Sequence, residues 1–152
     1  MSNTQAMCTS FMEQLLTGTH NFTTGTGDTF KAALYLASAT VNASTTVYSS
    51  TGEVTGTNYS PGGVAVTNGT SPSSTNTSAT AGTAYWTPSA SITYTNVTLT
   101  TAFDAVLIYN SSKSDKAVSV HTFGSQTVTA GTFTLTMPSN TTSTALLRLA
   151  TT

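Results

Sequence analysis

The stretch 103–123 reads "FDAVLIYNSSKSDKAVSVHTF" and contains two apolar runs joined by a short polar loop. The first run is apolar at both odd and even positions, which predicts a central strand covered on both faces. The second run returns across the loop, so the two runs predict a β-hairpin. We interpret the charges of Lys113, Asp115 and Lys116 as those of a turn that must stay in water.

The register of this hairpin predicts which face lies toward the core. We expect Asn110 to face Ala117. That register gathers four apolar side chains on the core face, with Leu107 opposite Val120 and Tyr109 opposite Val118. The other face carries Val106, Ile108, Ser119 and His121. A shift of one residue would mix the two sets, so burial should fix the odd–even register.

Further short strands are predicted along the rest of the chain. They are "TFKAALYLAS", "GVAVT", "AYWTP", "ASITYT", "QTVTAGTFTLTM" and "ALLRLA". In "QTVTAGTFTLTM", Phe133, Leu135 and Met137 alternate with threonines, and we take Gly131 to mark a turn. Short strands at this spacing predict an all-β fold, a single-domain antiparallel β-sandwich of the jelly-roll or immunoglobulin-like type.

Two segments depart from the strand pattern. "CTSFMEQLLTG" has helical spacing and predicts a short helix, with Thr9 or Ser10 as its cap and Gly18 at its end. We therefore divide the chain into an N-terminal arm with a short helix and linker, residues 1–27, and a β-sandwich domain, residues 28–152. The Ser/Thr-rich stretch 70–83 lacks a large anchoring side chain and predicts a mobile loop or projection.

The composition excludes several classes of protein. Charged residues make up 6% of the 152 residues and the net charge is −1, so nucleic-acid binding has no electrostatic basis. Threonine supplies much of the polarity, and threonine favours strands. The single cysteine, Cys8, excludes an intramolecular disulfide. We find no signal peptide and no apolar stretch long enough for a membrane, and expect synthesis in a reducing cytosol.

Several strings resemble a family of small virion proteins of tailed bacteriophages, including cyanophages. They are "NTQAMCTSF", "DTFKAALYLASAT", "AYWTPSASI", "TTAFDAVLIYN", "VHTFGSQTVTAGTFTLTMP" and "LLRLA", and together they run from near Asn3 to Ala150. The resemblance implies a structural protein, of the head decoration (cement) type or another small virion type. It implies no catalytic residues.

Catalytic and metal sites are weakly supported by the residues. Asp104 lies diagonally across from His121 in the expected register, near Ser119, which invites a triad interpretation. Ser119, however, shares a strand with His121 and has no nucleophile elbow around it. We expect no enzyme, and interpret His121 as a partner of Asp104 or as part of a subunit contact.

His20, His121 and Cys8 lack metal-ligand spacing, so no metal or other cofactor is expected, although carbonyl-rich loops could hold an ion.

The expected function is therefore structural. The candidate interface residues are Phe11, Leu15, Leu16, Tyr85, Trp86 and His121. Core packing is the default for Trp86, and a carbohydrate platform or an interface anchor is the alternative. Lys31, inside an apolar run, is expected to reach water or a carboxylate.

We expect a capsid decoration protein on the virion surface, made in the host cytoplasm, that binds the outer shell and bridges capsid subunits. Its expected partners are the major capsid protein and copies of itself, with the N-terminal segment as docking arm, and neither nucleic acid nor membrane. The alternative is a tail, head-fibre or connector protein for host attachment or head completion, with Tyr85, Trp86 or the 70–83 loop facing a receptor.

Overall fold

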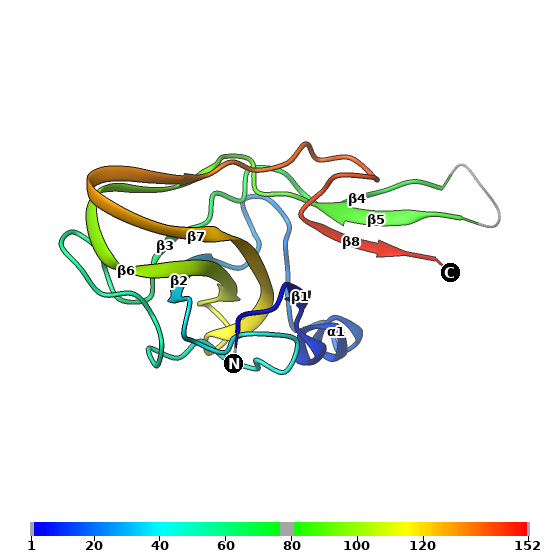
Figure 1. Cartoon of the computed structure of the whole chain (residues 1–152). Helices are drawn as coiled ribbons and strands as arrows, with labels where there is room; N and C mark the ends of the chain where they lie inside the picture. The colour runs from blue at the N-terminus through cyan, green and yellow to red at the C-terminus, as the bar shows by residue number, and fades with distance from the viewer. Residues whose placement is uncertain (1, 77–80, 152) are drawn as a thin grey trace.

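A computed structural model of the chain describes residues 2–76 and 81–151. The described chain is mostly β-structure, with one short helix and two antiparallel sheets, as the sequence predicts (Figure 1). The elements are β1 (Ala6–Met7), α1 (Thr9–Leu16), β2 (Phe30–Leu36), β3 (Val64–Ala65), β4 (Ser73–Ser74), β5 (Thr83–Trp86), β6 (Ile92–Asn110), β7 (Lys116–Leu135) and β8 (Leu147–Ala150). One sheet has the order β1-β7-β6-β2-β3 and the other the order β4-β5-β8.

The hairpin of β6 and β7 is the centre of the larger sheet. Leu107 faces Val120, as expected. Nearer the turn the pairing shifts by one residue, so Asn110 faces Lys116 and the expected pairing with Ala117 is wrong there. The shift is a β-bulge, a local irregularity of the ladder. It leaves the residues before it on the same faces of the hairpin, so their burial is unchanged.

Both faces of this hairpin are covered, as the apolar run on both parities predicts. Leu107 and Val120 are fully buried on one face, and Val106 and Ser119 are almost fully buried on the other. β2 pairs with β6 along seven positions and adds a second buried strand beside it. On the face of Val106, full burial extends as far as Ser119, and the next residue on that face, His121, is partly exposed.

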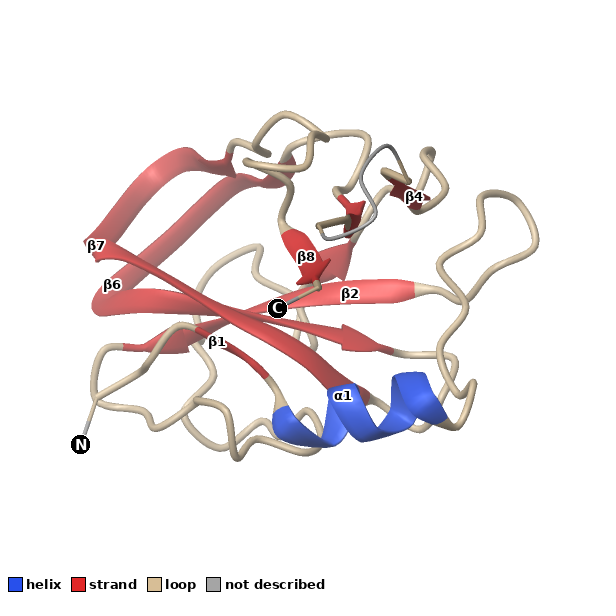
Figure 2. Cartoon of the chain, turned by 90° about the vertical axis from the view of Figure 1, so that its right-hand side faces the viewer, coloured by secondary structure: helices blue, strands red, loops and turns tan. Residues whose placement is uncertain are grey.

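β6 and β7 are long continuous strands that bend back together at the end far from α1 (Figures 1 and 2). The bend brings Phe133, from the far half of β7, against Phe103 in the near half of β6, with ring centroids 5.0 Å apart. Register shifts between Tyr94 and Ala105 disturb the ladder there, and bulges of this kind bend strand pairs. One hairpin therefore contributes to both layers of the fold.

The sequence pattern predicted two separate strands in place of each of these long ones, which is wrong. Gly131 lies within β7 and pairs with Val97, so it does not mark a turn. Asn96 and Ala130, next to Val97 and Gly131, adopt positive φ of 52° and 46° without ending either strand. The alternation of Phe133 and its neighbours is confirmed, since these side chains are partly buried between exposed threonines.

The N-terminal residues are built into the body of the protein. β1 pairs with β7, with Met7 opposite Ser119, and α1 lies beside the start of β7 (Figure 2). Phe11 of α1 is 2% exposed, and Phe22 stacks on Phe30 at 4.3 Å across the expected boundary at residue 27. One core therefore includes side chains from both sides of that boundary.

The predicted helix is confirmed as α1, with a different cap. Its N-cap is Cys8, without a side-chain cap hydrogen bond, so neither Thr9 nor Ser10 caps the helix as expected. The backbone N–H of Cys8 donates to Val118 O, which ties the start of the helix to β7. At the other end Gly18 has φ of 68°, the left-handed conformation that commonly ends a helix.

The smaller sheet projects to one side of the body (Figure 1). β5 lies between β4 and β8, and both outer strands have their other edge unpaired among the described residues. Part of the stretch 70–83 is thus a short strand, β4, while residues 77–80 of the expected loop lie outside the described residues.

Candidate interaction surface

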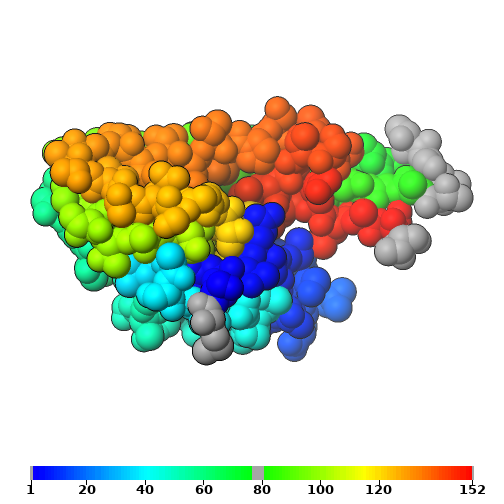
Figure 3. Space-filling model, in the orientation of Figure 1, coloured from blue at the N-terminus to red at the C-terminus, as the bar shows by residue number. Residues whose placement is uncertain are grey.

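An apolar pocket of about 110 Å³ lies between α1 and the projecting sheet. Its walls include Met7 of β1, Phe11 and Leu15 of α1, Trp86 of β5, and Leu147 and Leu149 of β8. Segments from the two ends of the chain therefore build it together. Figure 3 shows a recess where the N-terminal helix and the C-terminal strand meet.

Strand and helix periodicity explain which side chains face the pocket. In β8, Leu147 and Leu149 lie on one face and alternate with Arg148, because successive strand residues point to opposite faces. In α1, Phe11 and Leu15 are four residues apart and share one face. The sequence pattern "ALLRLA" and the helical spacing of α1 each indicated an apolar face, but not that the two faces meet.

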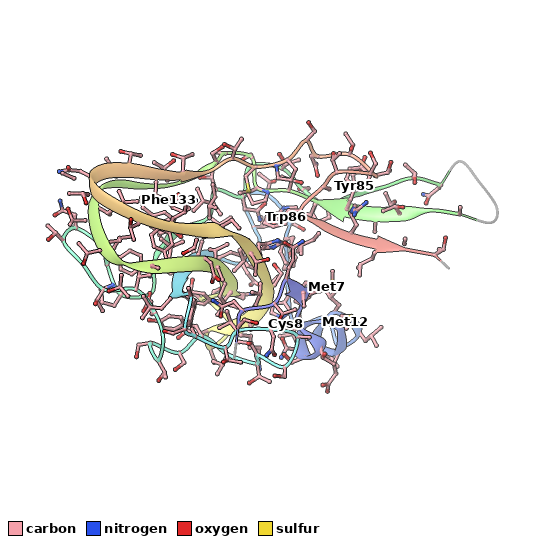
Figure 4. The ribbon with its side chains drawn as sticks, in the orientation of Figure 1. Met7, Cys8, Met12, Tyr85, Trp86 and Phe133 are labelled. Carbon is pink, nitrogen blue, oxygen red and sulfur yellow. The ribbon has the colours of Figure 1, made fainter. Side chains whose placement is uncertain are left out.

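Exposed apolar side chains lie on two of the elements that form the pocket, α1 and β8, and one of them, Leu149, lines it. Four large apolar residues are exposed within the part of the chain that the structure describes: Met12, Leu16, Val47 and Leu149. Met12 and Leu16 follow Phe11 and Leu15 by one position, about 100° around the helix. Figure 4 shows Met12 on the outer side of α1. We call the pocket together with Met12, Leu16 and Leu149 the apolar corner.

A more polar groove of about 470 Å³ adjoins the apolar corner. Met7 borders both, while His121 and Arg148 line the groove only. Arg148 donates a hydrogen bond from Nη1 to Ser143 O at 2.7 Å. The groove is bounded by β1 on one side and β8 on the other, so two sheet edges lie along it.

His121 is a partly buried histidine without a charged partner among the described residues. Its Nε2 lies 2.9 Å from Ser119 Oγ, in a hydrogen bond along its own strand. Burial lowers the pKa of His121 to about 4. Asp104 instead accepts a hydrogen bond from Asn3 Nδ2 at 2.6 Å. The expected contact between Asp104 and His121 is therefore wrong, and the acid of the triad interpretation is engaged elsewhere.

A second histidine joins α1 to the hairpin. His20 is bonded to Gln14 Oε1 through Nε2 at 2.7 Å and to Asn110 Nδ2 through Nδ1 at 2.9 Å. Asn110 Nδ2 also donates to Asp28 Oδ2 at 2.7 Å. Lys113 Nζ lies 3.6 Å from Asp28, so one charge of the loop reaches this network. Burial would raise the pKa of Asp28, but the hydrogen bonds from Asn21 and Asn110 and the Lys113 charge lower it overall.

Glu53 is a buried carboxylate that no pattern in the sequence indicated. It accepts hydrogen bonds from Tyr48 Oη at 2.6 Å, Tyr59 Oη at 2.8 Å and Gly62 N at 2.8 Å. Burial, with Glu53 nearby, raises the pKa values of both tyrosines. All three partners are donors fixed by the fold, which gives Glu53 a structural role in holding the loop that contains Gly62.

The predicted interface residues gather in one region. Phe11, Leu15, Tyr85 and Trp86 all line the pocket of the apolar corner, Leu16 is 91% exposed beside it, and His121 lies in the adjoining groove. Phe11 and Trp86, however, are buried, and Trp86 Nε1 donates to Asn68 Oδ1 and Thr70 O. They are buried residues of the pocket wall. The exposed apolar side chains of this region are Leu16, which was predicted, and Met12 and Leu149, which were not.

Two further findings concern the residues that are described. No group of three or more His, Cys, Asp or Glu side chains is placed to hold a metal ion among them. No helix in residues 2–76 and 81–151 is long and apolar enough to cross a membrane.

Comparison with protein-family models, curated proteins and solved structures finds no match to this chain.

Proposed function

We propose that the chain is a structural protein of a tailed-phage virion, a capsid decoration protein that binds the outer shell and bridges capsid subunits. The observation that carries this proposal is the apolar corner, where α1 and β8 expose Met12, Leu16 and Leu149 and together form an apolar pocket. Exposed apolar patches on a folded domain mark contact surfaces. The resemblance of the sequence to small virion proteins supplies the class of partner.

The chemistry of the surface suits such a role. Contacts through the apolar corner would keep their strength as salt changes, whereas exposed ion pairs contribute only about 0–1 kcal/mol and weaken with salt. A protein that binds only the assembled shell stabilises that state, because opening the shell also breaks the bound contacts. The free energy needed to open the shell therefore rises. The mechanism is thus mechanical, and it needs no cofactor.

The proposed partners are the major capsid protein and copies of the chain itself. The chain would be made in the host cytoplasm and would end on the virion surface. The net charge of −1 and the scarcity of lysine and arginine give no support to nucleic acid as a partner. In this role the N-terminal segment would contribute one wall of the contact surface, because α1 packs on the body and does not extend away from it.

A tail, head-fibre or connector role is the alternative, and one observation favours it. The paired strands β4 and β5 belong to the sheet that projects from the body, where a host receptor could approach them (Figure 1). In that role Tyr85, partly exposed on β5, would be available to a ligand, whereas buried Trp86 would not.

The copy number in purified virions separates the two roles. A decoration protein follows the symmetry of the shell and is present in every repeat, whereas a tail or connector protein is present in few copies. Quantitative mass spectrometry should find the chain at a copy number comparable to that of the major capsid protein. A small number per particle would support the alternative, and absence from washed particles would refute both.

A further inference from the structure

We propose that the free edge of β8 binds an extended peptide segment of a partner protein, with an acidic side chain placed opposite Arg148. The inference goes beyond the proposed function, because it names the chemistry of a partner from one strand and holds whichever protein supplies the segment. β8 pairs with β5 along one edge, and its other edge has no partner strand among the described residues. A peptide that adds a strand to such an edge gains main-chain hydrogen bonds.

The backbone groups on the free edge belong to Arg148 and Ala150. The N–H of Thr151 donates to Gly82 O at 3.0 Å, so Thr151 directs its backbone groups toward the side of β5. In an antiparallel ladder, successive residues direct these groups alternately to one side and to the other. Arg148 and Ala150 therefore direct their N–H and C=O groups away from β5. An added antiparallel strand can exchange two hydrogen bonds with Arg148.

The side chain of Arg148 determines the charge that the partner should carry. Arg148 is exposed, and it is the only charged residue among the described residues that line the polar groove, because burial lowers the pKa of His121 to about 4. Its Nη1 donates to Ser143 O, and no described carboxylate lies within salt-bridge distance. The remaining guanidinium donors suit a carboxylate. The residue opposite Arg148 in an added strand projects on the same face, so an acidic side chain there meets the guanidinium.

The opposite face of the same edge adds an apolar requirement. Leu149 is 46% exposed and lies on the pocket face of β8 with Leu147. In the added strand, the residues on either side of the acidic one project on this face, because strand side chains alternate. Apolar side chains at these two positions would cover Leu149. The expected segment therefore has the pattern apolar, acidic, apolar.

Other edges and other occupants fit less well. β4, at the opposite edge of the sheet, consists of Ser73–Ser74 and offers neither a charge nor a large apolar side chain. A second copy of β8 is disfavoured, because antiparallel pairing centred on Arg148 would place two guanidinium groups opposite each other. A charge on an edge strand can also prevent pairing. The two roles differ in sign, since loss of a protective Arg148 would strengthen strand binding, whereas loss of a binding Arg148 would weaken it.

Nuclear magnetic resonance titration of the isotope-labelled full chain tests the inference with the end-blocked peptide Ser-Thr-Val-Asp-Val-Thr-Ser. The amide signals of Arg148 and Ala150 should shift saturably, with a dissociation constant below about 1 mM. The same peptide with Lys in place of Asp should bind at least about fivefold more weakly. Methylation of the Asp nitrogen should abolish binding, because it removes the N–H that faces Arg148. Methylation of the following Val nitrogen, which faces away, should change the constant by less than about twofold.

Variants of the chain separate the charge pair from net charge. Arg148→Ala should weaken binding of the Asp peptide by about threefold or more, and Arg148→Glu should reverse the preference in favour of the Lys peptide. Lys116→Glu, with the same change in net charge at the start of β7, should keep the preference for Asp. The dispersion of the amide signals shows that each variant is folded.

Five results would overturn the inference and leave the virion proposal standing. They are no saturable shift at 5 mM peptide, shifts that map away from β8, equal binding of the Asp and Lys peptides, tighter binding by Arg148→Ala, and saturable binding of sialyllactose, a carboxylated sugar, in preference to the peptide.

Discussion

Asn110 Nδ2 lies 2.9 Å from Nδ1 of His20, although the two residues are 90 positions apart in the chain. An amide nitrogen only donates, so Nδ1 accepts and carries no proton. The proton of the neutral ring is then on Nε2, which donates to Gln14 Oε1. Burial lowers the pKa of His20, while Asp28 raises it and Lys116 and Lys113 lower it, with a net decrease. Protonation of His20 would turn its Nδ1 into a second donor facing Asn110.

Stability should therefore fall as the pH falls from neutrality. His20 and His121 both have lowered pKa values in the folded chain, so the unfolded chain binds protons first. Stability is complete above the unfolded pKa of about 6.5 and decreases until the folded pKa is passed. For His121, whose folded pKa is about 4, the loss by that pH is about 3 kcal/mol. Urea unfolding at pH 7.5, pH 5 and pH 4 measures this loss of unfolding free energy.

The matched control is His121→Gln, which removes the titrating ring but keeps a polar side chain beside Ser119. Its unfolding free energy should change less steeply between pH 6.5 and 5 than that of the wild-type chain, by up to about 1.4 kcal/mol per pH unit. Asp28 does not disturb this window, because its lowered pKa affects stability only at lower pH. An identical slope in both proteins would show that His121 is protonated freely in the fold.

Removal of the Glu53 carboxylate should destabilise the protein strongly. Glu53→Ala leaves the hydroxyls of Tyr48 and Tyr59 and the N–H of Gly62 without an acceptor, at an expected cost of about 3 kcal/mol in unfolding free energy. Glu53→Gln keeps one acceptor oxygen and should cost about 1–2 kcal/mol. Chemical denaturation measures both. Glu13→Gln, on the exposed face of α1, is the control and should change stability by less than about 0.5 kcal/mol in dilute protein.

The turn at Gly62 and Gly63 should tolerate no side chain at its second glycine. Gly63 has φ of 71°, and a Cβ there would overlap Ala32 O, on the backbone of a buried strand. Gly63→Ala should therefore prevent folding or cost more than about 3 kcal/mol. Gly25 has φ of 80° but nothing within 4 Å of an added Cβ, so Gly25→Ala should cost only about 1–2 kcal/mol. Equal melting temperatures for the two variants would contradict this account.

Cys8 should be unreactive in the folded protein. Its side chain is fully buried, and burial raises the pKa of the thiol to about 11, which removes the reactive thiolate at ordinary pH. Ellman's reagent at pH 8 should label less than about a tenth of the native chains in the time that labels all denatured chains. Rapid labelling of the native protein would show that α1 opens readily from β7.

The sequence predicted the parts of this fold that depend on local pattern. The apolar runs around the charged loop predicted the β6–β7 hairpin, and the spacing of Phe11 and Leu15 predicted α1. In "YSPGG" the two glycines adopt positive φ, at 86° and 71°, as turns rich in proline and glycine commonly require. Each of these features is set by residues close together in the chain, where periodicity and turn chemistry suffice.

The remaining features depend on long-range packing. The bend that brings Phe133 onto Phe103 accompanies register shifts between Tyr94 and Ala105, and no glycine or proline in that part of β6 signals it. The apolar corner needs α1 and β8 to meet, and these elements stand at opposite ends of the chain. The helical spacing placed Leu16 in α1 next to Leu15. Its exposure near a pocket depends on how α1 and β8 are arranged, which no local pattern shows.

Cryo-electron microscopy of the phage particle tests the central proposal most directly. A decoration protein predicts density for this β-domain on the outside of the head, repeated with the symmetry of the shell and in contact with neighbouring capsid subunits. Density only on the tail or at the portal vertex, or none on intact particles, would contradict the decoration role.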